Sequence, residues 1–296
     1  MTETLLVTGA AGQLGRRVLH HLLETQNVPA GRLVATTRDP SKLADLAAKG
    51  VTVRAASFDD ETSLVKAFSG VDRVLVISTD ALDEPGKRFR QHKTAVAAAV
   101  EAGVGHLAYT SMPKPEPGNP VLFAPDHYGT EQAIKATGLP YTIFRNSWYQ
   151  ENLMMALPQA LKTGKWFTSA GDGRTAHIAR DDIARAIAAA LASGSKESAT
   201  YLLTGAEALT NAEIAALAAA VTGKPIEAVN LSDEALTEGM KAAGVPEAFV
   251  PLLVSFDANT RTGGLAEVTA DAEKLSGITP RPLKSFFEAN KEALLG

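Results

Sequence analysis

Up to about residue 145, short apolar runs alternate with longer stretches whose apolar residues recur at helical spacing. The run 74–77 is apolar without interruption, which is typical of a strand buried on both faces. The pattern predicts strands at 5–8, 33–37, 51–55, 74–77, 106–110 and 141–145, and helices at 13–25, 40–47, 60–68, 85–102 and 126–137. Regular alternation of strand and helix indicates the α/β class, with a doubly wound parallel sheet.

The second half of the chain is less regular. Its pattern predicts helices at 151–163, 181–192 and 210–221, and further helices up to about residue 253. It also predicts strands at 166–169, 175–178, 199–203 and 227–231. Past residue 265 we expect a helix, a loop at 279–282 and a final helix. We expect two domains without a linker: 1–150 with the parallel sheet, and 151–296, a smaller, mostly helical α+β substrate region. The second should cover the carboxyl edge of the sheet, where open α/β sheets bind ligands.

Composition excludes several classes of protein. The 296 residues carry a net charge of −4, whereas nucleic-acid-binding domains are strongly basic. The absence of cysteine excludes disulfides, thiolate nucleophiles and iron–sulfur clusters, and the six histidines show no ligand spacing, so we expect no metal. No apolar run has the length of a membrane span and the N-terminus lacks a signal peptide. We therefore expect a cytoplasmic protein that contacts neither membrane nor nucleic acid.

The candidate cofactor site begins at the first strand. Gly9, Gly12 and Gly15 follow strand 5–8 at three-residue steps, and a helical pattern starts at Gln13. Glycine lets the chain turn sharply, lets the backbone approach a diphosphate, and lets a helix lie close to a strand. The helix start adds free N–H groups and the positive end of its dipole. The spacing predicts a dinucleotide site in a Rossmann-like fold, although a purely structural turn would leave the same pattern.

Arg38, at the end of strand 33–37, bears on which dinucleotide binds. Sites that select NAD usually end this strand with an acid, whereas a guanidinium suits bidentate binding of a 2′-phosphate. We therefore expect NADP as the cofactor, used as NADPH, with NADH use left open. We expect Asp39 to cap the helix that Pro40 opens. A solvated surface arginine is the alternative for Arg38.

Further cofactor contacts are expected where later strands end. Phe58 and Asp59 follow strand 51–55, where an aromatic plane and a hydrogen-bond acceptor suit adenine. A core phenylalanine beside a helix-capping aspartate is the alternative there. Hydroxyl residues at the ends of two more strands would border the ribose and the nicotinamide, unless they only cap helices. They are Ser78, Thr79, Thr110 and Ser111.

Together these segments resemble the short-chain dehydrogenase superfamily, and specifically its atypical NmrA-like branch. The resemblance is carried by TGAAGQLG at 8–15, TTRDPSKL at 36–43, FDDETSL at 58–64, GVDRVLVIS at 70–78 and YTS at 109–111. It continues through FRNSWYQEN at 144–152 and GDGRTAHIARDDIA at 171–184, nearly to the end of the chain. Within the branch, the chain is most similar to bacterial type 2 NAD(P)H:quinone oxidoreductases, with triphenylmethane reductases as near relatives.

The resemblance implies that the glycine turn holds the diphosphate and that later strand ends border the rest of the cofactor. The implied contacts are Gly9, Gly12, Gln13 and Leu14 for the diphosphate; Arg38 for the adenosine phosphate; Phe58 and Asp59 for adenine; Ser78, Thr79, Thr110 and Ser111 for ribose and nicotinamide; and segment 145–149, with Asn146 and Trp148, around the nicotinamide. Relatives often have Asp-Tyr where this chain has Ser57-Phe58, which weakens any adenine contact at position 57.

The chain lacks the proton donor of ordinary short-chain dehydrogenases. Those enzymes place a lysine four residues after a tyrosine, which lowers the pKa of the tyrosine. The residues four places after the tyrosines of this chain are Pro113, Gln132, Arg145, Leu153 and Gly205. A quinone acceptor fits better, because its reduction yields a delocalised phenolate that needs no committed acid. The protein then supplies mainly position and a dry apolar slot.

Aromatic side chains are candidates for the walls of that slot. Met112, Phe123, Trp148 and Tyr149 would contact the substrate, although Phe123 and Met112 are equally consistent with core packing. Tyr149 and His127 are the candidate catalytic residues, as weak proton donors or orienting groups, and a histidine titrates near neutral pH. The alternative for His127 is a surface or capping position at a helix start.

We therefore expect an NADPH-dependent reductase that transfers hydride to a small molecule, a quinone or a similar flat conjugated acceptor. The NmrA-like branch also contains redox sensors that bind NADP(H) without turnover, and the absent tyrosine–lysine pair agrees with a sensor. A third interpretation is a reductase or dehydrogenase of another substrate, such as a triphenylmethane dye, a phenolic compound or an unusual alcohol. Dimers are common in folds of this kind, but the sequence leaves open whether this chain forms a homodimer.

Overall fold

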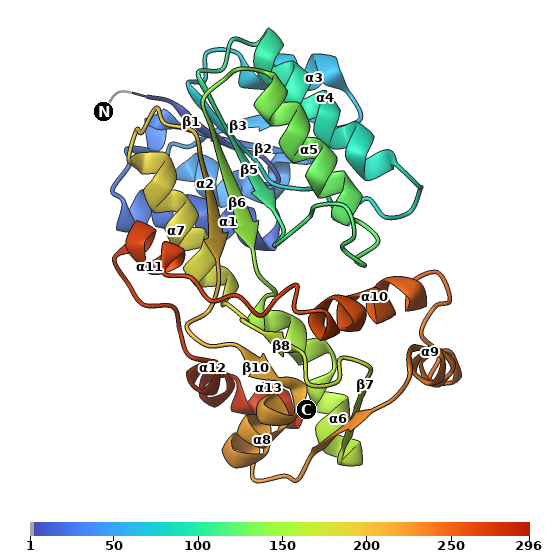
Figure 1. Ribbon diagram of the computed structural model, residues 1–296. Coiled ribbons are helices and arrows are strands. Elements are labelled where there is room, and N and C mark those ends of the chain that lie inside the picture. The colour runs from blue at the N-terminus through green and yellow to red at the C-terminus, as the bar shows by residue number, and fades with distance from the viewer. Residues whose placement is uncertain (1–2) are drawn as a thin grey trace.

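A computed structural model describes residues 3–296, and its centre is a seven-stranded sheet of order β3-β2-β1-β4-β5-β6-β9 (Figure 1). The strands are β1 (Leu5–Val7), β2 (Leu33–Thr37), β3 (Thr52–Ala55), β4 (Arg73–Val76), β5 (His106–Ser111), β6 (Tyr141–Asn146) and β9 (Ala199–Leu203). All neighbours pair in parallel, with Leu5 between Leu33 and Arg73. The strand order reverses between β1 and β4, so a crevice forms beyond their carboxyl ends.

Helices cover both faces of the sheet, as Figure 1 shows. On one face lie α1 (Gln13–His20), η1 (His21–Thr25), η2 (Ala30–Arg32), η3 (Pro40–Leu43), α2 (Ala44–Ala48), α7 (Arg180–Ala192) and α11 (Asp271–Ser276); on the other lie α3 (Glu61–Phe68), α4 (Lys87–Glu101) and α5 (Ala124–Ala136). Neighbouring residues of a strand point to opposite faces, so Leu5 and Val7 join one core and Leu6 joins the other. Both faces are apolar, which is why these strands show as uninterrupted apolar runs.

The sheet crosses the predicted domain boundary at residue 150. Strand β9 closes the sheet beyond β6, with Ala199 beside Thr142. Helix α7 packs against α1, and Ile183 and Val18 lie fully buried in the same core. Two elements of the second half therefore complete the sheet, and a division at residue 150 separates them from it.

The other elements form a lower part of the molecule in Figure 1. They are η4 (Gln150–Met155), α6 (Leu157–Thr163), β7 (Lys165–Thr168), β8 (Arg174–Thr175), β10 (Leu209–Thr210), α8 (Asn211–Thr222), β11 (Glu227–Asn230), α9 (Asp233–Ala242), α10 (Val250–Arg261), α12 (Leu283–Ala289) and α13 (Lys291–Leu295). The strands pair in twos, β11 with β7 and β10 with β8. Leu157, Ile214 and Phe287 share a separate apolar core. The predicted fold class, a doubly wound parallel sheet with a smaller, mostly helical region, is confirmed.

Some predicted elements differ from the observed ones. The helix predicted at 151–163 is two elements, η4 and α6, because Pro158 lacks the N–H that an unbroken helix needs. The last residues of the helix predicted at 13–25 form a single π-helical turn, η1. Helix α10 continues to Arg261, past the expected end near residue 253.

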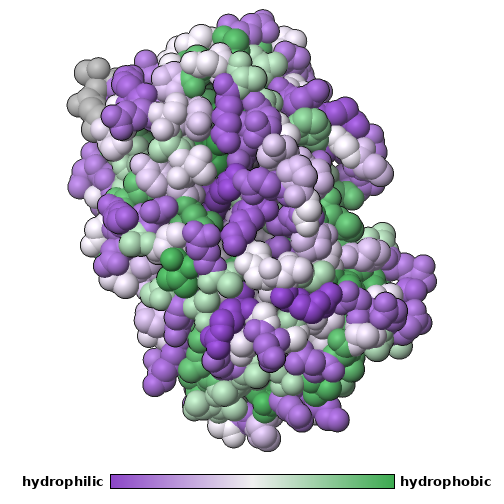
Figure 2. All heavy atoms as spheres, in the orientation of Figure 1, coloured by the Kyte–Doolittle hydropathy of each residue, from purple (hydrophilic) through white to green (hydrophobic). Residues whose placement is uncertain are grey.

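Polar side chains cover most of the face drawn in Figure 2, and apolar residues form small separate patches on it. Met155, with 77% of its surface exposed, and Phe167, with 49%, are among the large apolar side chains open to solvent. Between residues 3 and 296, no helix combines the length and the hydropathy needed to cross a membrane.

Candidate functional site

The glycines shape the turn between β1 and α1. Gly9 has a φ of +58°, which L side chains rarely adopt, and its carbonyl accepts the Gly12 N–H at 2.9 Å. A Cβ on Gly15 would lie 2.5 Å from the Gly9 oxygen, so only glycine lets α1 approach the turn this closely. Gly12 is the N-cap of α1, and no side chain caps the helix. The first N–H groups of α1 are therefore open to an anion.

A cleft of about 810 Å³ lies over this turn, at the carboxyl ends of β1 to β4. It brings together many of the residues predicted to contact the cofactor. They are Gly9, Gly12, Gln13, Leu14, Arg38, Phe58, Asp59, Ser78 and Thr79. The residues predicted from the glycine motif and from the strand ends thus lie in one cleft. The contact that each makes with a cofactor stays a prediction.

Hydrogen bonds separate the roles of Arg38 and Asp39. The Asp39 carboxylate caps η3, as expected, and accepts the backbone N–H of Ser41 at 3.1 Å and its hydroxyl at 2.6 Å. Arg38 is exposed in the cleft, and within residues 3–296 no hydrogen bond or ion pair engages its guanidinium. Arg38 therefore lines the cleft with an unengaged guanidinium, whereas Asp39 caps a helix and does not line the cleft.

After β3, one aspartate caps a helix and the aspartate before it lies in the cleft. Asp60 is the residue that caps α3, since its carboxylate accepts the Ser63 N–H at 3.1 Å. Asp59 lies in the cleft, where its carboxylate accepts the side-chain amide of Gln91 at 2.8 Å. Phe58 is half-buried and packs partly against the core beneath α3. Phe58 therefore serves the core and borders the cleft as well.

A second cavity, of about 450 Å³, adjoins the cleft, and we call it the acceptor cavity. All the residues predicted for the substrate slot line it, namely Met112, Phe123, Trp148 and Tyr149. The second half of the chain adds Leu153, Trp166, Phe167, Met240, Leu253 and Phe256. The ring of Phe256 meets the rings of Phe123 and Trp148 edge-on, with centroids 5.8 and 5.3 Å apart. Side chains of the second half thus line this cavity together with residues that follow β5 and β6, and the assignment of 151–296 as the substrate region stays a prediction.

Ser78 and Tyr149 border both the cleft and the acceptor cavity. The Ser78 N–H donates to the Thr110 hydroxyl at 2.9 Å, which ties the chain beyond β4 to the end of β5. Some residues predicted as cofactor contacts line the acceptor cavity rather than the cleft. They are Thr110, Ser111, Asn146 and Trp148. A ligand that bridges Ser78 and Tyr149 would reach both groups.

His127 is buried, so it occupies neither a surface nor a capping position. Its Nδ1 lies 2.8 Å from the Tyr109 hydroxyl, and its Nε2 accepts an N–H of Arg88 at 2.8 Å. Burial, and then the charges of Arg88 and His92, lower the pKa of His127 well below its usual value. The expectation that His127 titrates near neutral pH is therefore wrong. Because Nε2 accepts and Nδ1 faces Tyr109, the neutral ring has no N–H left for a ligand.

Arg88 places a positive charge beside that histidine, and sequence reasoning missed it. The side chain is 6% exposed, its Nε donates to the Thr79 carbonyl at 2.7 Å, and its buried Nη1 has no partner within residues 3–296. The guanidinium lies over the Phe123 ring, 4.7 Å from the centroid, and borders the acceptor cavity. Burial lowers the pKa of Arg88, but a guanidinium pKa starts so high that the charge persists.

Tyr149 lies below Arg180, whose guanidinium is 4.6 Å from the centroid of the tyrosine ring. Burial raises the pKa of Tyr149, and the charge of Arg180 acts in the opposite direction. Arg180 also borders the cleft, and its backbone N–H donates to the Glu151 carboxylate at 3.0 Å. Arg180 therefore joins the predicted residues at the meeting of the two cavities.

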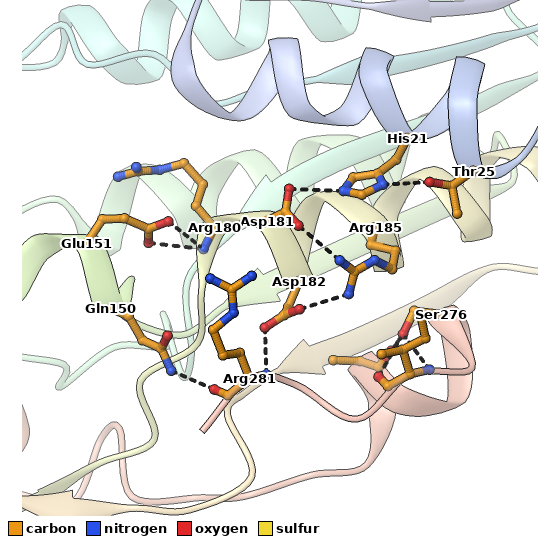
Figure 3. A network of polar contacts seen from close by, with 12 residues as sticks. His21, Thr25, Gln150, Glu151, Arg180, Asp181, Asp182, Arg185, Ser276 and Arg281 are labelled. Carbon is orange, nitrogen blue, oxygen red and sulfur yellow. Dashed lines mark hydrogen bonds and ion pairs between the residues drawn. The ribbon is translucent and has the colours of Figure 1, made fainter. Parts of the chain in front are cut away.

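Figure 3 shows how the start of α7, which carries Arg180, is held. Asp181 lies 3.1 Å from the ring of His21 in η1, and Asp182 accepts the backbone N–H of Arg281 at 2.8 Å. Arg185 pairs with both carboxylates, at 2.9 Å each. The network joins three segments that are distant in the sequence and so fixes the helix whose first residue, Arg180, borders the cleft.

Known proteins share both the sequence pattern and the fold. The model of the NmrA-like family matches residues 1–286. Quinone oxidoreductase 2 of Escherichia coli (strain K12) is 37% identical over 285 residues, 96% of this chain and 96% of that protein. The crystal structure of the NADPH-dependent quinone oxidoreductase from Escherichia coli, complexed with NADPH, has a TM-score of 0.91 at 35% identity and covers 97% of this chain and 99% of that one. The triphenylmethane reductase of Citrobacter sp., complexed with NADP(H), has a TM-score of 0.89 at 34% identity over 98% and 100% of the two chains.

Proposed function

This chain belongs to the NmrA-like family, and on that premise we propose that it is an NADPH-dependent reductase of quinones or similar flat conjugated small molecules. The observation that carries the proposal is the meeting of the two cavities at Ser78 and Tyr149. A cleft over a glycine turn ends there, and an apolar slot with aromatic walls begins. The bound NADPH and NADP(H) of the similar structures support the cofactor assignment.

The residues of the cleft fit NADPH. A side chain at Gly15 would meet the Gly9 carbonyl, so the close turn and the open N–H groups of α1 depend on glycine. Arg38 offers an unpaired guanidinium to the 2′-phosphate. The buried hydroxyl of Thr79 lacks a partner among the described residues and can bond to the nicotinamide half. When bound, the cofactor supplies the hydride.

The chain lacks the tyrosine–lysine pair of ordinary short-chain dehydrogenases, and Arg88 offers a positive charge to the acceptor instead. Hydride addition gives a quinone two electrons and leaves a negative charge on an oxygen, which a proton from water later neutralises. A buried guanidinium with a free Nη1 stabilises that charge through a charge-assisted hydrogen bond in a water-poor cavity. His127 holds the guanidinium in place. Tyr149, with its raised pKa, stays a neutral phenol that orients the acceptor.

Consumption of NADPH, followed at its near-ultraviolet absorption band, tests the proposal. The purified protein is mixed with NADPH and benzoquinone, with NADPH and a triphenylmethane dye, and with NADPH alone. We expect consumption that depends on the acceptor and oxidises one NADPH per quinone. Tight NADPH binding without consumption by either acceptor would contradict the proposal and favour a redox sensor.

Two further assignments accompany this function. A cytoplasmic location agrees with the proposed cofactor, since NADPH is a reductant of that compartment. A homodimer, a common state for this kind of fold, is tested by the mass of the protein in solution.

A further inference from the structure

Two charged side chains border the acceptor cavity within residues 3–296, and they come from different parts of the fold. Arg88 lies on α4, beside the junction with the cleft, and Asp257 lies on α10. His127 and His177 also border the cavity, but burial lowers the pKa of both, to about 4 for His177. Both rings are therefore neutral near pH 7. Burial raises the pKa of Asp257, and its hydrogen bonds from Ser169 and Thr168 act in the opposite direction. The cavity thus has a guanidinium on one side and a carboxyl group on the other.

Asp257 has one oxygen engaged and one free. Its Oδ2 accepts the Ser169 N–H at 2.7 Å and the Thr168 hydroxyl at 2.8 Å, whereas no hydrogen bond from the described residues reaches Oδ1. The neighbouring cation, Arg261, is paired with Asp233 at 2.8 Å, so Asp257 has no ion-pair partner between residues 3 and 296. A partly buried carboxylate of this kind is stabilised by a ligand that donates a hydrogen bond.

A series of aromatic contacts along the cavity wall leads from Arg88 to Phe256, the residue before Asp257. The Arg88 guanidinium stacks on Phe123 at 4.7 Å, and the Phe123 ring contacts Phe256 at 5.8 Å between centroids. Phe256 precedes Asp257 on α10, and Trp148 flanks it at 5.3 Å. A flat ring system stacked on these side chains would present one edge to Arg88 and the other to Asp257.

We propose that Asp257 selects conjugated acceptors that carry an amino or ammonium group at the end remote from the reacting atom. The proposal rests on the proposed function and deepens it by naming the substrate class. The acceptor oxygen faces Arg88, next to the cleft from which hydride arrives, and the nitrogen donates to Oδ1 of Asp257. Because the nitrogen is remote from the reacting atom, its bond to Asp257 is the same before and after hydride transfer. Such a contact lowers KM and leaves kcat nearly unchanged.

The test compares naphthoquinone with a naphthoquinone that carries an aminoethyl chain, in the wild-type protein and in Asp257→Asn. The wild type should have a KM for the amino compound about 10- to 100-fold below that for naphthoquinone, the range expected of one charge-assisted hydrogen bond. Asp257→Asn should raise the KM of the amino compound by a similar factor, with kcat, the KM of naphthoquinone and the Kd of NADPH unchanged. Asp233→Asn, which alters the adjacent carboxylate outside the cavity, is the matched control and should change neither KM.

Absence of a preference for the amino compound in the wild type would overturn the proposal, and that result needs no variant. Equal loss with both acceptors in Asp257→Asn would also overturn it, because the carboxylate would then act only through Thr168 and Ser169. Failure of the proposed function gives a different result, since neither compound would be reduced. Calorimetric binding of both compounds to the NADPH complex then still shows whether Asp257 prefers the amino group.

Discussion

The cofactor cleft is centred on a backbone turn, and all its lining residues except Tyr149 and Arg180 come from the first 91 residues of the chain, whereas the acceptor cavity is lined by side chains spread from residue 78 to residue 260. In the cleft, the turn from Gly9 to Leu14 presents carbonyl and N–H groups. In the acceptor cavity, Arg88, Trp148 and Phe256 come from α4, from the loop after β6 and from α10. A site made of backbone keeps one ligand as long as its glycines remain. A site made of side chains can change its ligand while the fold stays the same.

The similar proteins fit this contrast. The Escherichia coli and Citrobacter reductases share the fold of this chain, at TM-scores of 0.91 and 0.89, and both structures hold a phosphorylated nicotinamide dinucleotide. Their names nevertheless give different acceptors, a quinone and a triphenylmethane dye. Substitutions in the cleft should therefore affect every acceptor alike, and substitutions in the acceptor cavity should affect acceptors selectively.

The largest effect is expected from Gly15→Ala. The new Cβ would lie 2.5 Å from the Gly9 oxygen, so α1 must move away from the turn. We expect at least a 100-fold loss of NADPH affinity by fluorescence titration, and a free energy of unfolding lower by about 1–3 kcal/mol, as overpacking costs elsewhere. Gly31→Ala is the matched control, because no atom lies within 4 Å of its added Cβ. Wild-type affinity for NADPH in Gly15→Ala would contradict the claim that the cleft depends on its backbone turn.

Arg88→Met comes next and separates catalysis from cofactor binding. Loss of the buried guanidinium should lower kcat with benzoquinone about 100-fold, as removal of one oxyanion donor does elsewhere, while the Kd of NADPH stays within about threefold. Arg90→Met, two residues on and exposed on the same helix, should leave kcat unchanged. Steady-state kinetics with both variants measures the difference, and equal kcat values would refute the role given to Arg88.

Arg38→Ala should change the choice of cofactor and leave the choice of acceptor as it is. Without the unpaired guanidinium, the KM for NADPH should rise about 10- to 100-fold, the range of a charge-assisted hydrogen bond. The KM for NADH, which has no 2′-phosphate, should change little. The ratio of the two specificity constants measures the effect, and an equal loss for both cofactors would contradict the assignment.

The smallest effect on turnover is expected from a change of pH between 6 and 8. Burial lowers the pKa of His92 to about 3 and of His177 to about 4, and that of His127 well below its usual value. All three rings stay neutral between pH 6 and 8, so kcat with a quinone should vary by less than about twofold there. An inflection of kcat near pH 6.5 would show that one of these histidines titrates during turnover.

The same pKa shifts determine whether acid raises or lowers the free energy of unfolding. The unfolded chain protonates these histidines below about pH 6.5, whereas the folded chain does so only nearer pH 4. The free energy of unfolding should therefore fall as the pH drops from about 6.5 towards 4. Urea denaturation at several pH values measures this slope, and a constant free energy over that range would contradict the buried, neutral rings.

The same contrast explains how much the sequence predicts. Gly9, Gly15 and the capping role of Asp39 are readable because each depends on the local backbone, and the strands are readable because both faces of the sheet are buried. Arg88 is not readable, since α4 starts with a run of basic residues that is typical of a solvated helix face. Asp257 was missed as well, and the strand at 199–203 was predicted without its place beside β6, because both places depend on which distant segments pack together.

Transfer of hydride from the cleft to the acceptor cavity is the central claim, and labelled NADPH tests it most directly. NADPH with deuterium on one or the other face of nicotinamide C4 is mixed with the protein and benzoquinone. Mass spectrometry then measures the deuterium content of the NADP⁺ formed. We expect one labelled form to lose all its deuterium and the other to keep it, because a fixed cleft presents one face of the nicotinamide to the cavity. Loss from both faces, or no NADP⁺ formation that depends on the quinone, would contradict it.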